Sequence, residues 1–182
     1  TPKGFVQLSS KFIYENGLIS NKKIQTNTLI HEFGHNLGLI DYYDTSGSFS
    51  PLGGYDMQDS SVGDWNVYSK ALMGWITPEI VDETDFGSSN KATYTIKSAT
   101  STGDCLIIPI AGSEYKGIFS EYIMVELFVP EGLHKYDSIL YGLNTTVGVR
   151  IYHINATMEK RILEGKNGEQ CEIGTIHYSN ST

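Results

Sequence analysis

The feature that most constrains this chain is a pair of histidines, His31 and His35, set four residues apart within an apolar repeat. The repeat has the spacing of an α-helix and consists of Leu29, Ile30, Phe33 and Leu37. Side chains four apart on a helix project from one face, so the segment predicts a packed helix that presents two imidazoles side by side. Candidate caps for its first turn are Thr26, Asn27 and Thr28.

Three further residues complete the pattern His-Glu-x-x-His-x-x-Gly-x-x-Asp. Glu32 lies next to the first histidine, where it can accept a proton from a metal-activated water. Gly38 suits the left-handed backbone at which helices often end, so the chain can turn there and bring Asp41 back toward the histidines. The pattern predicts a zinc site with His31, His35 and Asp41 as metal ligands and Glu32 as the general base.

The third ligand stays open on the sequence alone. Asp41 needs only a turn after the helix, whereas Asp56 or Asp59 would reach the metal from a later segment. A nearby glutamate ligand is excluded, because the chain has no glutamate between Glu32 and Glu79. Asp41 could instead bond only to local backbone amides at the helix end.

The segments after the zinc motif resemble secreted zinc peptidases of the immune inhibitor A family. Residues 53–57 are similar to the methionine-containing turn of metzincins, in which a methionine underlies the zinc site. Later blocks of the family resemble residues 64–70, 72–78, 121–126 and 148–154. The resemblance implies a bacterial, secreted zinc endopeptidase made as a zymogen, with Met57 and Gly38 as structural supports of the site.

The chain also departs from the metzincin pattern. Metzincins usually offer a third histidine where this chain has Asp41. Some of them carry a tyrosine two residues after the methionine, where this chain has Asp59. A replacement for that tyrosine as hydrogen-bond donor to the transition state is undecided, and the candidates by proximity in sequence are Tyr42, Tyr43 and Tyr55.

Composition limits the expected partners. The 182 residues carry a net charge of −8 and only 13 lysines and arginines, so nucleic acids and anionic membranes are not expected partners. No stretch has the length of a membrane span. The expected partners are protein or peptide substrates, and the expected location is extracellular, as the resemblance implies.

Few residues precede the zinc motif. Zinc peptidases generally build the upper wall of their cleft from a sheet and a backing helix, so we expect the rest of a catalytic domain and a pro-segment upstream. A chain lacking them could be an inactive metal-binding fragment that serves as a binding module, which is the alternative to an active endopeptidase. A β-rich structural or adhesion module with an accidental motif is a third hypothesis.

The expected fold class is α+β in two parts. Residues 1–78 would form the C-terminal part of a zincin-like catalytic domain, with a strand or two over 5–14, a polar loop over 41–63 and a helix capped by Asp64 and ended by Gly74. Residues 79–182 would form a mostly antiparallel β-rich domain packed on it, as a small sandwich or barrel. Its expected strands are 93–97, 105–110, 122–129, 147–154 and 173–178.

Other polar residues carry weaker signals. Cys105 and Cys171 belong to no metal-binding pair and could form a disulfide or remain two buried thiols. Calcium is a second candidate cofactor, although no EF-hand spacing is present. Its candidate ligands are Asp41, Asp44, Asp56, Asp59 and Asp64. Structural or surface roles are expected for His134, His153 and His177.

Overall fold

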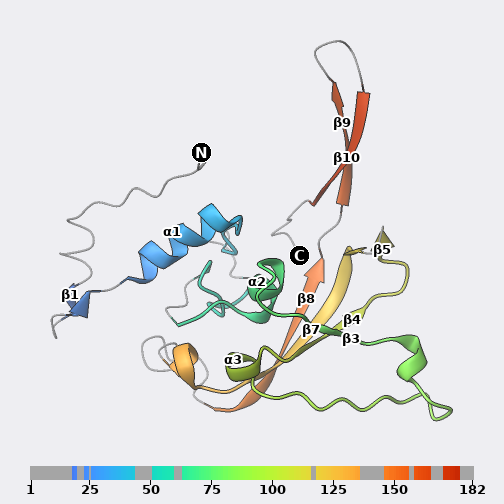
Figure 1. Cartoon of the computed structure of the whole chain (residues 1–182), viewed down its shortest axis with the longest axis horizontal. Helices are drawn as coiled ribbons and strands as arrows, with labels where there is room; N and C mark the ends of the chain where they lie inside the picture. The colour runs from blue at the N-terminus through green and yellow to red at the C-terminus, as the bar shows by residue number, and fades with distance from the viewer. Residues whose placement is uncertain are drawn as a thin grey trace. The chain divides into compact units, whose positions relative to one another are not determined.

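The chain is a mixed α and β protein with few helices, seen in the computed structural model of Figure 1. The structure describes residues 18–19, 23–24, 26–43, 51–59, 63–115, 118–135, 146–155, 158–164 and 170–176. The chain divides into two compact units, Thr1–Ile76 with Val129–Val147, and Thr77–Phe128 with Gly148–Thr182. The division falls close to the expected cut after residue 78. A single cut could not anticipate that Val129–Val147 returns to the first unit.

The expected helix around the two histidines forms as α1 (Asn27–Leu37) in the first unit. Thr26 occupies the N-cap position, although its side chain makes no capping hydrogen bond. The helix ends at Gly38, whose φ of 104° lies in the left-handed region that L side chains avoid. The role predicted for Gly38 is confirmed. A short hairpin, β1 (Leu18–Ile19) with β2 (Lys23–Ile24), precedes the helix.

The second helix of this unit, α2 (Val67–Leu72), begins later than expected. Its N-cap is Asn66, whose side chain accepts a hydrogen bond from the backbone N–H of Ser69, so the prediction of Asp64 as the cap is wrong. Asp64 instead pairs with Lys70. Both residue types make good caps, and position relative to the first helical turn decides between them. The helix ends at Met73, one residue before the glycine expected to end it.

The second unit contains a four-stranded sheet in the order β3-β4-β7-β8. The four strands are β3 (Glu79–Ile80), β4 (Cys105–Pro109), β7 (Glu121–Phe128) and β8 (Gly148–Asn155). The pairs β4–β7 and β7–β8 are antiparallel, whereas β3 pairs with β4 in parallel. Three expected strands are therefore confirmed to within a residue at each end. In the part of the chain that the structure describes, the sheet is open and mixed, and the expected sandwich or barrel is not formed.

The strand expected over residues 93–97 is wrong. These residues alternate between exposed and half-buried, as an extended segment does, but form no ladder with any described residue. A strand needs a neighbouring backbone as well as an alternating pattern. An isolated bridge then joins Ser98 to Leu127 of β7, and the chain enters the short helix α3 (Ala99–Thr102).

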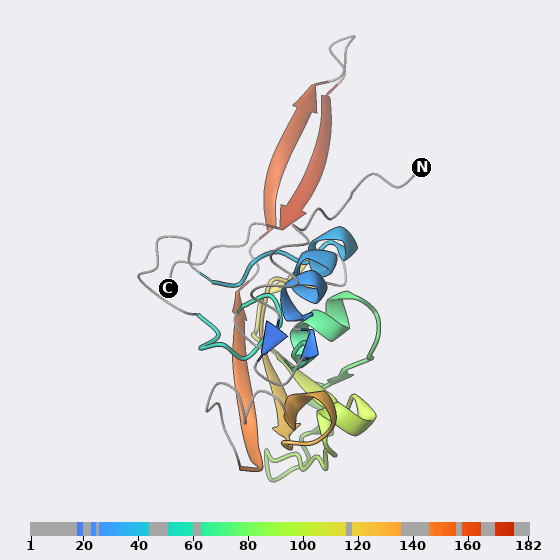
Figure 2. The ribbon, with the colours of Figure 1, turned by 90° about the vertical axis from the view of Figure 1, so that its left-hand side faces the viewer.

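The remaining elements are short or stand apart from the sheet. The last expected strand, 173–178, overlaps β10 (Gln170–Ile176) over its first four residues, and its last two lie outside the described residues. β10 pairs with an unexpected strand, β9 (Met158–Glu164), in an antiparallel hairpin (Figure 2). The short elements are η2 (Glu83–Asp85), η3 (Gly132–His134), β5 (Glu114–Tyr115) and β6 (Ile118–Phe119). The strand expected over 5–14 and the residues Asp44 and His177 lie outside the described residues.

The inner face of β7 and β8 combines apolar packing with a buried charge pair. Met124 and Phe128 are fully buried, and Glu126 between them is buried as well. Glu126 accepts a hydrogen bond of 2.6 Å from the hydroxyl of Tyr152 and lies 3.5 Å from a guanidinium nitrogen of Arg150. A buried carboxylate needs such partners, because burial without them is costly.

Cys105 lies opposite Glu126 in the sheet register and is a free, buried thiol. Burial, reinforced by the nearby charges of Glu126 and Asp104, raises the pKa of Cys105 to about 11. The disulfide considered between Cys105 and Cys171 is therefore not formed in this structure. The prediction of a buried free thiol is confirmed for Cys105. The side chain of Cys171 lies outside the described residues.

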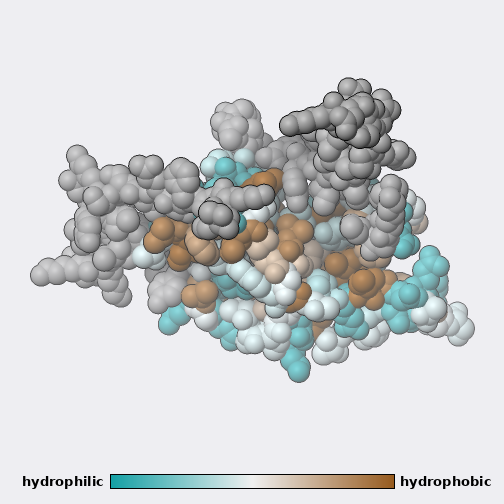
Figure 3. All heavy atoms as spheres, turned by 45° about the horizontal axis from the view of Figure 1, so that its top comes forward, coloured by the Kyte–Doolittle hydropathy of each residue, from teal (hydrophilic) through white to brown (hydrophobic). Residues whose placement is uncertain are grey.

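The face of α1 opposite the histidines is apolar and exposed. Leu29, Phe33 and Leu37 are spaced four apart and are 42%, 54% and 40% exposed. Apolar side chains at the surface are drawn in brown in Figure 3. Among the described residues, no helix combines the length and the hydropathy that crossing a bilayer requires.

Candidate metal centre

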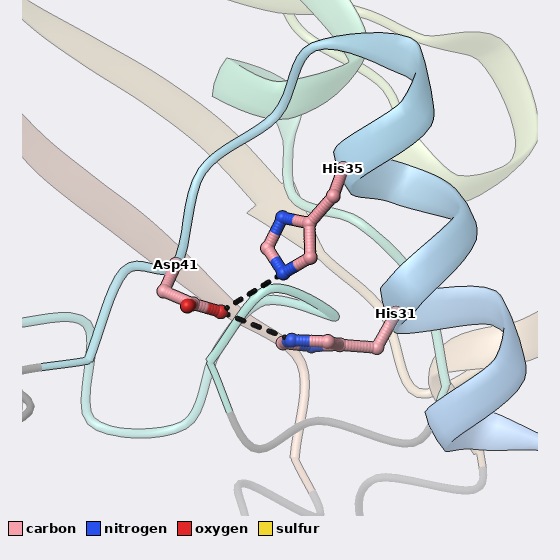
Figure 4. A group of neighbouring side chains, drawn as sticks. All are labelled: His31, His35 and Asp41. Atoms are coloured by element: carbon pink, nitrogen blue, oxygen red, sulfur yellow. Dashed lines mark hydrogen bonds and ion pairs between the residues drawn. The ribbon is translucent and has the colours of Figure 1, made fainter. Parts of the chain in front are cut away.

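Two imidazoles and one carboxylate converge on a single point beside α1. The Nε2 atoms of His31 and His35 lie 3.0 Å and 3.3 Å from Oδ1 of Asp41. The potential ligand atoms of the three residues all lie within 4.8 Å of one another. Figure 4 shows the two rings projecting from adjacent turns of the helix toward the carboxylate, which the chain after Gly38 brings back to them.

The outer nitrogens of both rings are held by backbone carbonyl groups. Nδ1 of His31 lies 2.7 Å from the carbonyl oxygen of Met57, and Nδ1 of His35 lies 2.9 Å from that of Leu39. A carbonyl only accepts hydrogen bonds, so these contacts assign the ring proton to Nδ1 in both histidines. The Nε2 lone pairs then point at an oxygen of Asp41, and three electron-rich atoms face one another.

Such an arrangement is stable when a cation lies among the three atoms. Neutral Nε2 atoms and a carboxylate oxygen are the ligands that zinc takes in proteins. Two ligands bound tetrahedrally at about 2.0–2.1 Å are separated by about 3.3 Å, which agrees with the 3.0 Å and 3.3 Å measured between Asp41 and the rings. The side chains of His35 and Asp41 are 32% and 35% exposed, so the three atoms are accessible from solvent. The donor set therefore fits zinc.

The two other candidates for the third ligand are engaged elsewhere. Asp59 accepts a hydrogen bond of 2.9 Å from the backbone N–H of Gly54. Asp56 is fully buried and accepts three hydrogen bonds, two of them from the start of α2. The three donors are the backbone N–H groups of Gln58 and Asn66 and the hydroxyl of Ser69. Within the described ranges, the geometry favours Asp41 as the carboxylate ligand.

These contacts also bear on the calcium site considered above. Of its five candidate ligands, Asp44 lies outside the described residues. Asp41 faces the histidines, Asp64 pairs with Lys70, and the remaining two bind backbone groups within their own loop and at the start of α2. Each of the four described aspartates therefore has different hydrogen-bonding partners. Among the described residues, they do not converge as the oxygen ligands of one calcium ion would.

Met57 contacts the candidate site through its main chain. The residue is buried, and its backbone carbonyl, rather than its thioether, is the group that contacts His31. The next residue, Gln58, is also buried and reaches the backbone of α1. Sequence reasoning missed Gln58, because no motif marks it and only the folded loop brings it to the helix.

Of the three candidate tyrosines, Tyr43 contacts the metal centre. Its ring stacks on that of His31, with the centroids 6.3 Å apart and the planes 22° apart. Its hydroxyl hydrogen-bonds with Asp41. Partial burial, followed by the negative charges of Asp41, Glu32 and Asp59, raises the pKa of Tyr43 above its usual 10.0.

The neighbouring tyrosines point into other surroundings. Tyr42 is buried, packs against the ring of Tyr68 at 5.9 Å, and its hydroxyl oxygen lies 3.3 Å from that of Ser69. Tyr55 lies with its ring against Gly53. Asp41 and Tyr43 are half-buried on either side of buried Tyr42, as alternate side chains of an extended segment are.

The buried carboxyl of Asp56 makes folding depend on pH. Burial raises the pKa of Asp56 to about 7, although the hydrogen bonds that it accepts oppose this shift. A carboxyl that holds its proton more tightly in the folded chain stabilises the fold at low pH, and this contribution is lost as pH rises from about 4 to about 7. We expect the free energy of unfolding to fall more steeply across this window than in Asp56→Asn, by up to about 1.4 kcal/mol per pH unit.

Urea unfolding at successive pH values measures this difference in slope. The control is Asp82→Asn, because hydrogen bonds from Thr84 lower the pKa of the exposed Asp82 and place its contribution at more acidic pH. This control should keep the wild-type slope above pH 5. Parallel stability curves for the wild type and Asp56→Asn would contradict the assignment of a protonated, buried carboxyl.

Comparison with known protein families, curated proteins and solved structures finds no match to this chain. The case for a metal centre therefore stands on the positions of His31, His35 and Asp41 and on the hydrogen bonds that orient them. The resemblance to immune inhibitor A peptidases rests on the sequence motifs alone.

Proposed function

We propose that the chain is the metal-binding part of a zinc-dependent endopeptidase. The observation that carries the proposal is the convergence of the two Nε2 atoms on one oxygen of Asp41, with each opposite ring nitrogen bound to a carbonyl. His31, His35 and Asp41 would hold the ion. A zinc ion held there would supply Lewis-acid chemistry, which acidifies a water molecule and polarises a carbonyl group.

Glu32 would serve as the general base for the attack of water on a peptide bond. It follows His31 on α1, is half-buried, and acts electrostatically on the phenol of Tyr43. In this role its carboxylate takes a proton from the attacking water and then delivers it to the nitrogen of the departing amine. The proton is thus returned, and the peptide bond is exchanged for a carboxylate and an amine.

Tyr43 would donate a hydrogen bond to the carbonyl oxygen of the scissile bond as negative charge develops on it. A tyrosine phenol, with an ordinary pKa of about 10, is protonated at neutral pH, as a donor must be. The hydroxyl bonds with Asp41 in this structure, so it would exchange this partner for the substrate oxygen. Donors aimed at a developing oxyanion contribute strongly to catalysis.

Zinc content and peptide cleavage together test the proposal. We expect the wild type to bind zinc and to cleave casein in a reaction that a zinc chelator stops. Glu32→Gln should retain zinc and lose activity by about 10²-fold or more, because general-base catalysis contributes about 10²–10⁴-fold. His31→Ala is the matched variant that should lose zinc as well as activity.

The outcomes separate the hypotheses. A wild type that binds zinc but cleaves no protein would be the metal-binding module considered as the alternative function. Failure to bind zinc would refute both. Full activity in Glu32→Gln would contradict the role given to this carboxylate.

Substitution of the tyrosines tests the hydrogen-bond donor. Tyr43→Phe should lower kcat by about 10²–10³-fold, as loss of one oxyanion donor does, with KM and zinc content nearly unchanged. Tyr42→Phe is the control, because its hydroxyl contacts Ser69 rather than the metal centre. Steady-state kinetics on a fluorogenic peptide compare the two. Equal kcat values for Tyr43→Phe and the wild type would rule out Tyr43 as the donor.

A further inference from the structure

We infer that Gln58 is a positioning residue of the metal centre, whose carboxamide holds α1 in the orientation that brings the two imidazoles together on Asp41. The side chain is fully buried. Its Nε2 donates a hydrogen bond of 3.2 Å to the backbone carbonyl of His31 and lies 3.3 Å from Nδ1 of His35. Its Oε1 accepts a hydrogen bond of 3.1 Å from the indole N–H of Trp65.

The backbone carbonyl groups of Met57 and Gln58 also hydrogen-bond with the site. The carbonyl of Gln58 accepts a hydrogen bond of 3.0 Å from the backbone N–H of Tyr42, the residue next to Asp41. The preceding carbonyl, that of Met57, is the one that binds Nδ1 of His31. This two-residue segment therefore makes two hydrogen bonds to His31, one to its ring and one to its carbonyl, and a third to the neighbour of the carboxylate ligand.

Gly34 provides the space that the carboxamide occupies. This residue lies in the middle of α1, where glycine weakens a helix relative to alanine. A Cβ atom at this position would lie 2.2 Å from Oε1 and 2.8 Å from Cδ of Gln58. The two residues are therefore complementary, and a side chain at Gly34 would displace the carboxamide from both histidines.

The inference rests on the metal site of the proposed function but not on peptide cleavage. A residue that only filled space would change the stability of the fold and leave metal affinity unchanged. A residue that orients ligands changes the affinity, typically by about 10–100-fold when it is removed. Metal affinity therefore distinguishes the two roles.

A double-mutant cycle on Zn²⁺ affinity provides the test, with a chromophoric chelator as competitor. Gln58→Ala should weaken zinc binding by about 10–100-fold. Gly34→Ala should also weaken it, because the new methyl group displaces the carboxamide. In the Gln58→Ala background, Gly34→Ala should cause no further loss, because the atoms that it would meet are gone.

Bound Co²⁺ provides a second readout, because its visible absorption reports the coordination geometry. The spectrum should change in Gln58→Ala and remain that of the wild type in Val67→Ala, a control that removes buried volume from α2. If Gln58→Ala fails to fold, Trp65→Phe removes the hydrogen bond to Oε1, along with part of the ring that packs against Trp75, and should give a smaller loss of affinity in the same direction.

Three results would overturn the inference. They are wild-type zinc affinity in the folded Gln58 variant, losses that add independently in the double variant, and equal losses in Val67→Ala. A wild type that binds zinc without cleaving peptides would contradict the endopeptidase proposal and leave this inference standing. A wild type that binds no zinc would remove both.

Discussion

The hydrogen bonds from the two Nδ1 atoms to the carbonyl groups of Met57 and Leu39 are the interactions on which the candidate site depends. Each one fixes a proton on the outer nitrogen and turns the lone pair of the inner nitrogen toward Asp41. A histidine without such a partner is free to rotate or to change tautomer. With both rings held, the electron pairs of three side chains meet at one point, and a divalent cation is the species that this arrangement accommodates.

The fold supplies these carbonyl groups from two different sources. Leu39 comes directly after Gly38, so the left-handed end of α1 places its carbonyl group beside His35. Met57 belongs to a loop that reaches the helix through Gln58 and is anchored to α2 by the buried carboxyl of Asp56. The histidine motif on α1 is thus connected to a buried hydrogen-bond network through Gln58 and Asp56. The motif alone does not predict this network.

The sequence predicted the helix and the strands whose residues follow a local pattern. The period of the apolar residues and the glycine at the helix end identified α1, and enrichment in β-branched and aromatic residues identified β4, β7 and β8. The features that the sequence did not predict depend on contacts between residues that are far apart in the chain. Residues 93–97 alternate as a strand does but lack a ladder partner within the described chain, and Gln58 binds a residue that is 27 positions earlier in the sequence. The choice of Asp41 over Asp56 and Asp59 likewise required the folded loop, which uses the latter two carboxylates elsewhere.

X-ray absorption at the zinc edge of the zinc-loaded protein tests the central claim most directly, because it counts and identifies the ligand atoms. The account predicts two imidazole nitrogens at about 2.0–2.1 Å and a carboxylate oxygen at about 2.0–2.2 Å, with the carboxylate contribution lost in Asp41→Ala. A single imidazole, or a sulfur ligand at about 2.3 Å, would contradict it.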